Sequence, residues 1–289
     1  MDNRPIGVLD SGVGGFTVLR ELQGYLPDEP TIYLGDSKRM PYGEKTNEEI
    51  IECVNSDIRF LEEKNVKLIL LACNTASSLI DSLTSRVPVF SIVEAGVQAV
   101  ENEVTDGNVG LIATRATVKN GVYDRISASH GDRFTFVSYG TPTLAQVINN
   151  HPGELKMLRD NIKAAVDPIL NRCDTQYLLL GCTHFPIVTE TISKMYPQLH
   201  LINPAEQQSR ILARYLKEHD LEGTGKQSSV FVTGSSRDYF LSRRMLDDLN
   251  IYYDNLELAT LDIDKKIDKK VNEEAVQTEN NQNKEFSYA

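Results

Sequence analysis

The chain has 289 residues, of which 40% are hydrophobic and 25% are charged; this composition predicts one large or two medium folded domains and excludes a disordered or fibrous chain. Its 30 basic and 41 acidic residues give a formal net charge of -11, which disfavours nucleic acid and anionic membranes as partners. Its longest apolar runs are far shorter than the ~18 residues of a membrane span, and its first residues lack a signal region, so the sequence predicts a cytoplasmic protein.

Short β-branched apolar runs alternate with amphipathic stretches along the chain. This alternation is typical of α/β folds with mainly parallel strands. The strands that we expect are residues 6–9, 31–34, 67–72, 89–92, 109–112, 134–138, 176–180, 199–202 and 230–232.

The clearest helix starts with a capping-box sequence at residues 46–49 and carries an apolar stripe from Ile50 to Leu61. From about Asn255 the sequence is polar and has no such stripe. We therefore expect residues 255–289 to form a polar, disordered tail outside the fold.

The four cysteines are Cys53, Cys73, Cys173 and Cys182. Their spacing is not that of a zinc site or a thioredoxin-type redox site, so we expect no metal. Cys53 on the apolar helix face and Cys173 near a helix end are interpreted as structural thiols. Cys73 and Cys182 differ, because each follows a buried strand and a small residue and precedes polar side chains. Ligands of doubly wound sheets bind at the carboxyl ends of strands, so two similar α/β domains would direct both thiols into one cleft.

Two thiols on opposite walls suit one class of reaction. Inverting a carbon stereocentre needs a base on one face and an acid on the other. A thiol with an ordinary pKa near ~8.5 can fill either role near neutral pH. The sequence has no metal or PLP motif, which favours racemisation or epimerisation without a cofactor; a buried inert thiol is the alternative for each cysteine taken alone.

Two further motifs and one histidine follow predicted strands. Residues 10–15, Asp-Ser-Gly-Val-Gly-Gly, lack the spacing of a nucleotide-binding loop, but they would let backbone N–H groups and Ser11 approach a substrate carboxylate. Asp10 either handles a proton or an ammonium group or caps the next helix. Residues 36–43 lie at the same predicted edge, and His184 is placed to polarise the neighbouring thiol.

In combination these segments resemble the bacterial glutamate racemases, a family of cofactor-independent racemases. The motifs are Asp-Ser-Gly-Val-Gly-Gly, Asp-Ser-x-x-x-Pro-Tyr-Gly, Ala-Cys-Asn-Thr-Ala and Gly-Cys-Thr-His-Phe-Pro, in this order. The resemblance extends from about Pro5 to Leu246. It implies two doubly wound α/β domains with the active site in the cleft between them. The first would comprise residues 1–97 and 206–254, and the second residues 98–205.

The same resemblance implies an enzyme that interconverts L- and D-glutamate without a cofactor or metal and supplies D-glutamate for peptidoglycan. Cys73 would take the α-proton of D-glutamate and Cys182 that of L-glutamate, with Asp10 and His184 assisting. The residues implied to contact the substrate are Asp10, Ser11, Pro41, Tyr42, Gly43, Asn74, Thr75, Thr114, Thr117, Thr183 and His184. Whether the enzyme forms a homodimer is left open.

One position departs from the family pattern. Family members often carry a Glu that supports the second catalytic side, and Asn149 stands at that position here. Asn cannot act as a carboxylate base, so either Glu154 substitutes, or the role is dispensable, or turnover is reduced. Two alternatives stay open: an aspartate racemase or other two-cysteine racemase such as a hydantoin racemase, and a catalytically silent binding or regulatory protein.

Overall fold

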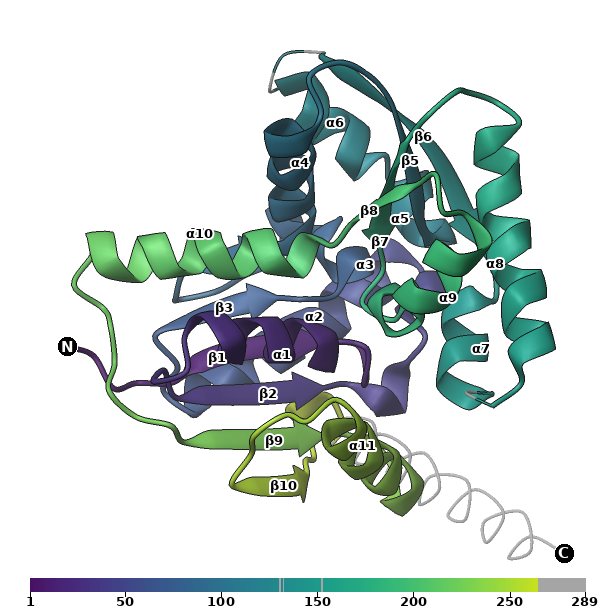
Figure 1. The fold of residues 1–289 in the computed structure, drawn as a ribbon. Coiled ribbons are helices and arrows are strands. Elements are labelled where there is room, and N and C mark those ends of the chain that lie inside the picture. Colours follow the sequence, from purple (N-terminus) through teal and green to yellow (C-terminus); the bar gives the residue numbers. More distant parts are fainter. Residues whose placement is uncertain (130, 132, 152, 265–289) are drawn as a thin grey trace, which may run out of the picture.

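The computed structural model describes residues 1–129, 131, 133–151 and 153–264, and its strands form two parallel sheets. Sheet A has the order β10-β9-β2-β1-β3-β4 and sheet B the order β6-β5-β7-β8. The strands of sheet A are β1 (Ile6–Asp10), β2 (Thr31–Gly35), β3 (Leu68–Leu71), β4 (Val89–Ser91), β9 (Ser228–Val232) and β10 (Asn255–Leu258). Those of sheet B are β5 (Gly107–Thr114), β6 (Phe134–Thr141), β7 (Tyr177–Gly181) and β8 (His200–Ile202). Figure 1 shows sheet A in the lower half of the molecule and sheet B above it.

Helices cover both faces of each sheet, which confirms the doubly wound α/β class. On sheet A, α1 (Phe16–Tyr25) and α10 (Pro204–Glu218) pack on one face and α2 (Asn47–Glu63) on the other. On sheet B, α4 (Ile92–Glu103) and α6 (Val122–Ser129) oppose α7 (Leu144–Asn150), α8 (Leu155–Leu170) and α9 (Thr189–Met195). The remaining helices are α3 (Asn74–Ser77), α5 (Arg115–Lys119) and α11 (Ser236–Asp248), with short 3-10 turns η1 (Ser37–Arg39), η2 (Tyr42–Glu44), η3 (Ile80–Ser82) and η4 (Phe185–Val188).

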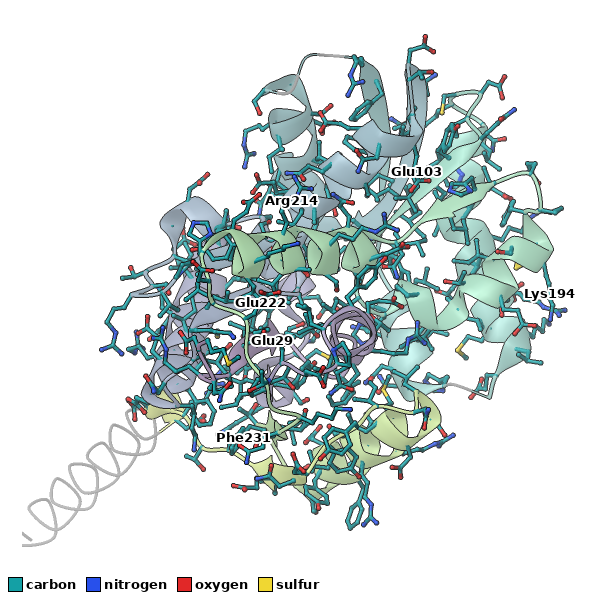
Figure 2. All side chains as sticks on the ribbon, turned by 60° about the vertical axis from the view of Figure 1, so that its left-hand side comes forward. Glu29, Glu103, Lys194, Arg214, Glu222 and Phe231 are labelled. Carbon is teal, nitrogen blue, oxygen red and sulfur yellow. The ribbon has the colours of Figure 1, made fainter. Side chains whose placement is uncertain are left out.

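Helix α2 forms as its sequence predicts. The Thr46 hydroxyl accepts a hydrogen bond from the Glu49 amide at 3.2 Å, and the Glu49 carboxylate accepts one from the Thr46 amide at 2.8 Å. Two otherwise unbonded amides are thereby satisfied at the start of the helix. Its apolar stripe is buried against sheet A. There Phe60 meets the ring of Phe231 of β9 edge-on, with ring centroids 5.3 Å apart; Phe231 is labelled in Figure 2.

The expectation that the chain leaves the fold at about residue 255 is wrong for residues 255–264. Strand β10 pairs in parallel with β9, and the segment after it buries Leu261 and Ile263. A four-residue edge strand needs no amphipathic stripe, and only two apolar side chains anchor the segment after β10, so composition gave little signal. The rest of the expected tail, residues 265–289, lies outside the described residues.

The strands of sheet A come from two separate stretches of chain. They span residues 6–91 and 228–258, whereas sheet B uses only residues 107–202. On this basis we propose that a discontinuous first domain encloses the second, with boundaries near residues 97 and 206. One apolar core runs through α4 and α10 from sheet A to sheet B. Within the described part of the chain, no helix is both long and apolar enough to cross a membrane.

Candidate active site

A cavity of about 190 Å³ lies where loops from the two sheets meet. The loops after β1, β2 and β3 of sheet A contribute to its walls, as do the end of β5 and the loop after β7 of sheet B and helix α7. Its lining residues are Ser11, Met40, Pro41, Tyr42, Gly43, Cys73, Asn74, Thr75, Thr114, Ala145, Gln146, Asn149, Asn150, Cys182, Thr183 and His184. Carboxyl ends of parallel strands are the usual ligand-binding edge of such sheets.

Most of the residues singled out from the sequence line this cavity. Asp10 and Thr117 do not; both are buried directly behind lining residues, which they contact through hydrogen bonds. Four lining residues were not expected from the sequence, namely Met40, Ala145, Gln146 and Asn150. Met40 falls inside the motif at residues 36–43, so that motif offered a signal. The α7 residues follow no strand directly, and no pattern in the sequence pointed to them.

Cys73 forms the sheet A wall of the cavity. It is the residue before the four-residue helix α3, and its thiol donates to the Ser11 hydroxyl at 3.5 Å. Burial raises the pKa of this thiol to about 11, and the nearby Asp10 carboxyl group contributes to the increase. The protonated thiol is therefore the resting form of Cys73 in the unliganded cavity at neutral pH.

Cys182 forms the sheet B wall and has a different neighbour. Its sulfur lies 3.8 Å from Nδ1 of His184, and burial raises the thiol pKa well above its ordinary value, with Cys73 and Asp10 adding to the effect. Burial also lowers the pKa of His184 to about 4, so the imidazole is neutral at pH 7. Among the residues that the structure describes, Nε2 of His184 is buried and has no hydrogen-bond partner.

The glycine-rich turn after β1 holds Asp10 in place. Oδ2 of Asp10 accepts hydrogen bonds from the amides of Gly12 at 3.1 Å and Gly15 at 3.0 Å, while Oδ1 accepts one from the Thr183 hydroxyl at 3.2 Å. Those two amides therefore bind Asp10 and are not free for a substrate carboxylate. Burial raises the pKa of Asp10 to about 6 in spite of these hydrogen bonds.

The turn has no room for a side chain at Gly14. A Cβ atom there would lie 2.5 Å from both Nδ1 of His184 and Oγ1 of Thr183. The backbone of the turn therefore packs directly against the loop that carries Cys182. The Thr17 hydroxyl, which donates to the Thr183 carbonyl at 3.0 Å, fastens the same contact.

Hydroxyl groups bridge the two sheets on another side of the cavity. Oγ1 of Thr75, after β3, lies 2.9 Å from Oγ1 of Thr114, at the end of β5, and 3.3 Å from that of Thr117. Tyr123 of α6 donates to the Asn74 side-chain carbonyl at 2.6 Å. These groups present short polar side chains, which suit the binding of a small, highly polar ligand.

Asn149 reaches the cavity from α7, whereas Glu154 does not. The Asn149 Nδ2 group donates to Asn150 at 3.1 Å, and its Oδ1 atom is buried without a hydrogen-bond partner in the described part of the chain. Glu154 is exposed and pairs with His151 at 3.0 Å on the surface. The arrangement gives no support to the hypothesis that Glu154 takes the role of the family Glu.

The other two cysteines lie away from the cavity. Cys53 is buried in the core between α2 and sheet A, where burial raises its thiol pKa to about 12. Cys173 follows α8, and its thiol donates to the Ile169 carbonyl at 3.6 Å. Neither lines the cavity.

The sequence matches a known family of racemases over residues 16–208. The family model is that of the Asp/Glu/hydantoin racemases, and the chain belongs to this family of isomerases.

Individual relatives share most of its length. It is 35% identical over 266 residues to the glutamate racemase of Persephonella marina, which covers 89% of this chain and 98% of the relative. A crystal structure of a glutamate racemase isoform from Bacillus anthracis superposes with a TM-score of 0.82 at 29% identity, covering 90% of this chain and 98% of the other. That of Francisella tularensis in complex with D-glutamate gives 0.81 at 32% identity, covering 91% and 99%.

Proposed function

We propose that this protein is a glutamate racemase that interconverts L- and D-glutamate by proton transfer between Cys73 and Cys182, without a cofactor or metal. The observation that carries the proposal is that both thiols line one small cavity together with hydroxyl and amide side chains. Cys182 lies beside the His184 imidazole, and Cys73 lies within the electrostatic influence of the Asp10 carboxyl group. The relatives named above are glutamate racemases, and one was crystallised with D-glutamate.

The two directions use the thiols in opposite protonation states. With D-glutamate, the Cys73 thiolate takes the α-proton, the C–H electron pair stays on the substrate as a carbanion, and the Cys182 thiol donates its proton to the other face. The product is L-glutamate, with Cys73 protonated and Cys182 as the thiolate. The reverse reaction starts from that state, so each turnover needs both groups.

Burial keeps both thiols protonated in the unliganded cavity, so each needs a base. Burial and, after it, the charge of Asp10 raise the pKa of the Cys73 thiol; we assign Asp10 as the group that takes the Cys73 proton. His184 is neutral and its Nδ1 atom is 3.8 Å from the Cys182 sulfur, so it can accept the Cys182 proton. A bound substrate ammonium group adds positive charge, which favours the thiolate.

Substrate binding is assigned to the polar groups around the thiols. We propose that Ser11, Asn74, Thr75, Thr114 and Thr183 bind the carboxylates and the ammonium group. Thr117 supports Thr75 and Thr114 from behind through the hydroxyl contacts described above. Tyr42 and its neighbours Pro41 and Gly43 supply a wall. The Tyr42 hydroxyl is already bonded to the carboxyl groups of Asp36 and Asp57, so only its ring and backbone are left for a ligand.

The decisive experiment is incubation with L-glutamate in deuterated water without PLP or added metal. We expect D-glutamate to form and deuterium to enter the α position, and a strong chelator or a carbonyl-trapping reagent to leave the rate unchanged. Glutamate should be preferred to aspartate, because one methylene can be worth ~10–200-fold in kcat/KM. Comparable kcat/KM for both acids would support a broader two-cysteine racemase, and no exchange at all would support a silent binding protein.

The cellular role follows from the product. A cytoplasmic enzyme of this kind would supply D-glutamate for peptidoglycan. Depletion of the gene product in its host should then cause loss of cell shape that external D-glutamate reverses. A depletion phenotype that D-glutamate does not reverse would contradict this role.

A further inference from the structure

The segment after β10 reaches a turn that forms one wall of the cavity. Asp264 is buried at the end of this segment, where its amide donates to the Leu261 carbonyl at 3.0 Å and its carboxylate accepts from the Leu261 amide at 3.2 Å. Leu261 and Ile263 are buried in the core beneath α2. The carboxylate is therefore fixed with respect to sheet A before it makes any further contact.

The Asp264 carboxylate binds two consecutive cations of η1. Lys38 donates to Oδ1 at 2.7 Å. Nη2 of Arg39 lies 2.9 Å from Oδ2, an ion pair without the geometry of a hydrogen bond. Arg39 is itself buried and forms a second, short ion pair with Asp36 at the end of β2. Asp264 and Asp36 thus hold the Arg39 guanidinium from two sides.

The same network continues to Tyr42. Asp36 accepts a hydrogen bond from the Tyr42 hydroxyl at 2.7 Å, and Asp57 of α2 has an oxygen 2.9 Å from that hydroxyl. A phenol has one hydrogen to donate, so one of the two carboxyl groups must carry a proton of its own. Burial and the neighbouring Asp36 raise the pKa of Asp57 well above its usual range, which identifies Asp57 as the protonated member.

With that proton the network is electrically balanced. Two cations, Lys38 and Arg39, face two carboxylates, Asp36 and Asp264, while Tyr42 and Asp57 are neutral. Apart from the half-exposed Lys38, the members of the network are buried. Matched charges hold the buried members in a single arrangement, and removal of one of them leaves another charge buried without its partner.

The turn that the network holds has little room to move. A Cβ atom on Gly12 would lie 2.6 Å from the sulfur of Met40, and one on Gly43 would lie 3.0 Å from Cβ of Thr114. Met40 is therefore packed closely against the turn after β1, and Gly43 against the end of β5. A shift of a few tenths of an ångström in this turn changes the shape of the cavity wall.

We propose that Asp264 is a positioning residue of the cavity: through Lys38 and Arg39 it fixes the turn at residues 37–44, and with it the wall that contacts the substrate. The kinetic part of this inference rests on the proposed racemase function. The structural part, that Asp264 holds the turn, does not depend on what the cavity binds.

The kinetic test compares Asp264→Asn, which removes the charge and keeps the shape, with Glu257→Gln on the exposed surface of β10. For Asp264→Asn we expect KM for glutamate to rise about tenfold with kcat within a factor of about three, because a displaced wall weakens binding of the substrate and of the transition state alike. Glu257→Gln should match the wild type. Unchanged kinetics in both variants, or an equal loss in both, would overturn the positioning role.

The structural test measures amide hydrogen exchange of residues 38–45 in the unliganded protein. The amides of Arg39 and Lys45 donate to Asp36 and Tyr42 within this turn, so their exchange reports its opening. We expect exchange at least about tenfold faster in Asp264→Asn than in Glu257→Gln. Lys38→Met removes a half-exposed partner of the same carboxylate and should give a smaller increase in the amide exchange of the same residues. This second variant keeps the test valid if Asp264→Asn fails to fold.

The two tests separate the two proposals. If wild-type protein racemises no glutamate, the proposed function fails, and the exchange experiment alone decides whether Asp264 holds the turn. Equal exchange rates in all variants would overturn that claim, whatever the activity. Faster exchange in Asp264→Asn together with an unchanged KM would overturn the claim that this wall positions the substrate.

Discussion

The two walls of the cavity share a sequence pattern but differ in chemistry. On each sheet a buried strand ends in a small residue, a cysteine and polar side chains, as in residues 68–76 and 177–186. The group that acts on Cys73 through its charge is Asp10, a carboxyl group held by two amides and the Thr183 hydroxyl. Beside Cys182 stands His184, an imidazole whose Nε2 atom has no partner among the described residues.

We call Asp10 and His184 the helper groups of the two thiols. Burial shifts their pKa values in opposite directions. It raises the pKa of Asp10 to about 6 and lowers that of His184 to about 4, and in both cases it favours the uncharged form. At neutral pH the Asp10 carboxylate has already lost its proton, whereas His184 has not gained one. Both are consequently able to accept a proton from the neighbouring thiol, one as an anion and the other as a neutral base.

The largest expected effect comes from removing either thiol. Cys73→Ala and Cys182→Ala should each lower racemisation in both directions by more than about 10³-fold, because every turnover needs an acid and a base. The measurement is chiral analysis of glutamate starting from each enantiomer. Cys173→Ala is the matched control and should keep wild-type activity. One inactive and one active variant would indicate a mechanism with a single base.

The same variants assign each thiol to a face. A variant that keeps one base can still eliminate HX from a glutamate analogue that carries a leaving group. Cys73→Ala should then process the L-analogue through Cys182, and Cys182→Ala the D-analogue through Cys73. If both variants preferred the same enantiomer, the facial assignment would be wrong.

The second effect comes from forcing the two walls apart. In Gly14→Ala the new Cβ atom meets His184 and Thr183 at 2.5 Å, so the Cys182 loop must shift. Because a misplacement of about 1 Å can cost about 100-fold in rate, we expect a loss of that order in kcat/KM. Gly24→Ala is the control, since nothing lies within 4 Å of its added Cβ atom. A Gly14→Ala variant with wild-type kinetics would show that the contact between the walls is unimportant.

Much of this arrangement follows from local sequence. The nine expected strands are all present, because alternating β-branched runs and amphipathic stretches reflect burial on both faces of a parallel sheet. Both cysteines were placed at strand ends for the same reason. The tenth strand, β10, was missed because its pairing with β9 at the sheet edge depends on tertiary contact and not on composition.

The site was predictable only where its residues directly follow strands. Gln146 and Asn150 reach the cavity because α7 packs beside η4, which depends on how α7 and α8 pack on sheet B. Asp264 contacts Arg39 across 225 positions of sequence, and no local pattern signals such a pair. The sequence did single out Asn149, through its departure from the family pattern, and the structure places that side chain in the cavity wall.

A third, smaller effect is expected at Asn149. This residue lines the cavity together with His184, so we expect its side chain to form a hydrogen bond with the ligand. Loss of one such bond costs about 0.5–1.5 kcal/mol, and Asn149→Ala should therefore lower kcat/KM about 2- to 12-fold. Asn102→Ala on the exposed side of α4 is the control.

Asn149→Glu should instead raise kcat with L-glutamate, because a carboxylate on this wall makes the His184 imidazole a stronger base. A fall in kcat would contradict that reasoning.

The last effect is on the pH dependence of stability, where two opposing contributions nearly cancel in the wild type, and it tests the helper groups without any assay of activity. The pKa of Asp10 is raised on folding, so its contribution to stability is fully present below about pH 3.8 and is lost as the pH rises through about 6. The pKa of His184 is lowered, so its contribution is present above about pH 6.5 and is lost as the pH falls through about 4. Each shift corresponds to about 3 kcal/mol, and the two nearly cancel between pH 4 and 6.

Replacing either residue alone should reveal the pH-dependent contribution of the other. In Asp10→Asn only His184 titrates, so stability measured by urea unfolding should rise relative to wild type as the pH increases from about 4 to 6. In His184→Gln only Asp10 titrates, and relative stability should fall over the same interval. The slope in either case can reach about 1.4 kcal/mol per pH unit. The two variants control for each other, since a general loss of packing would lower both curves without giving them opposite slopes. Parallel curves would mean that burial does not shift the pKa values of Asp10 and His184 in opposite directions. The two walls would then differ only in their thiols.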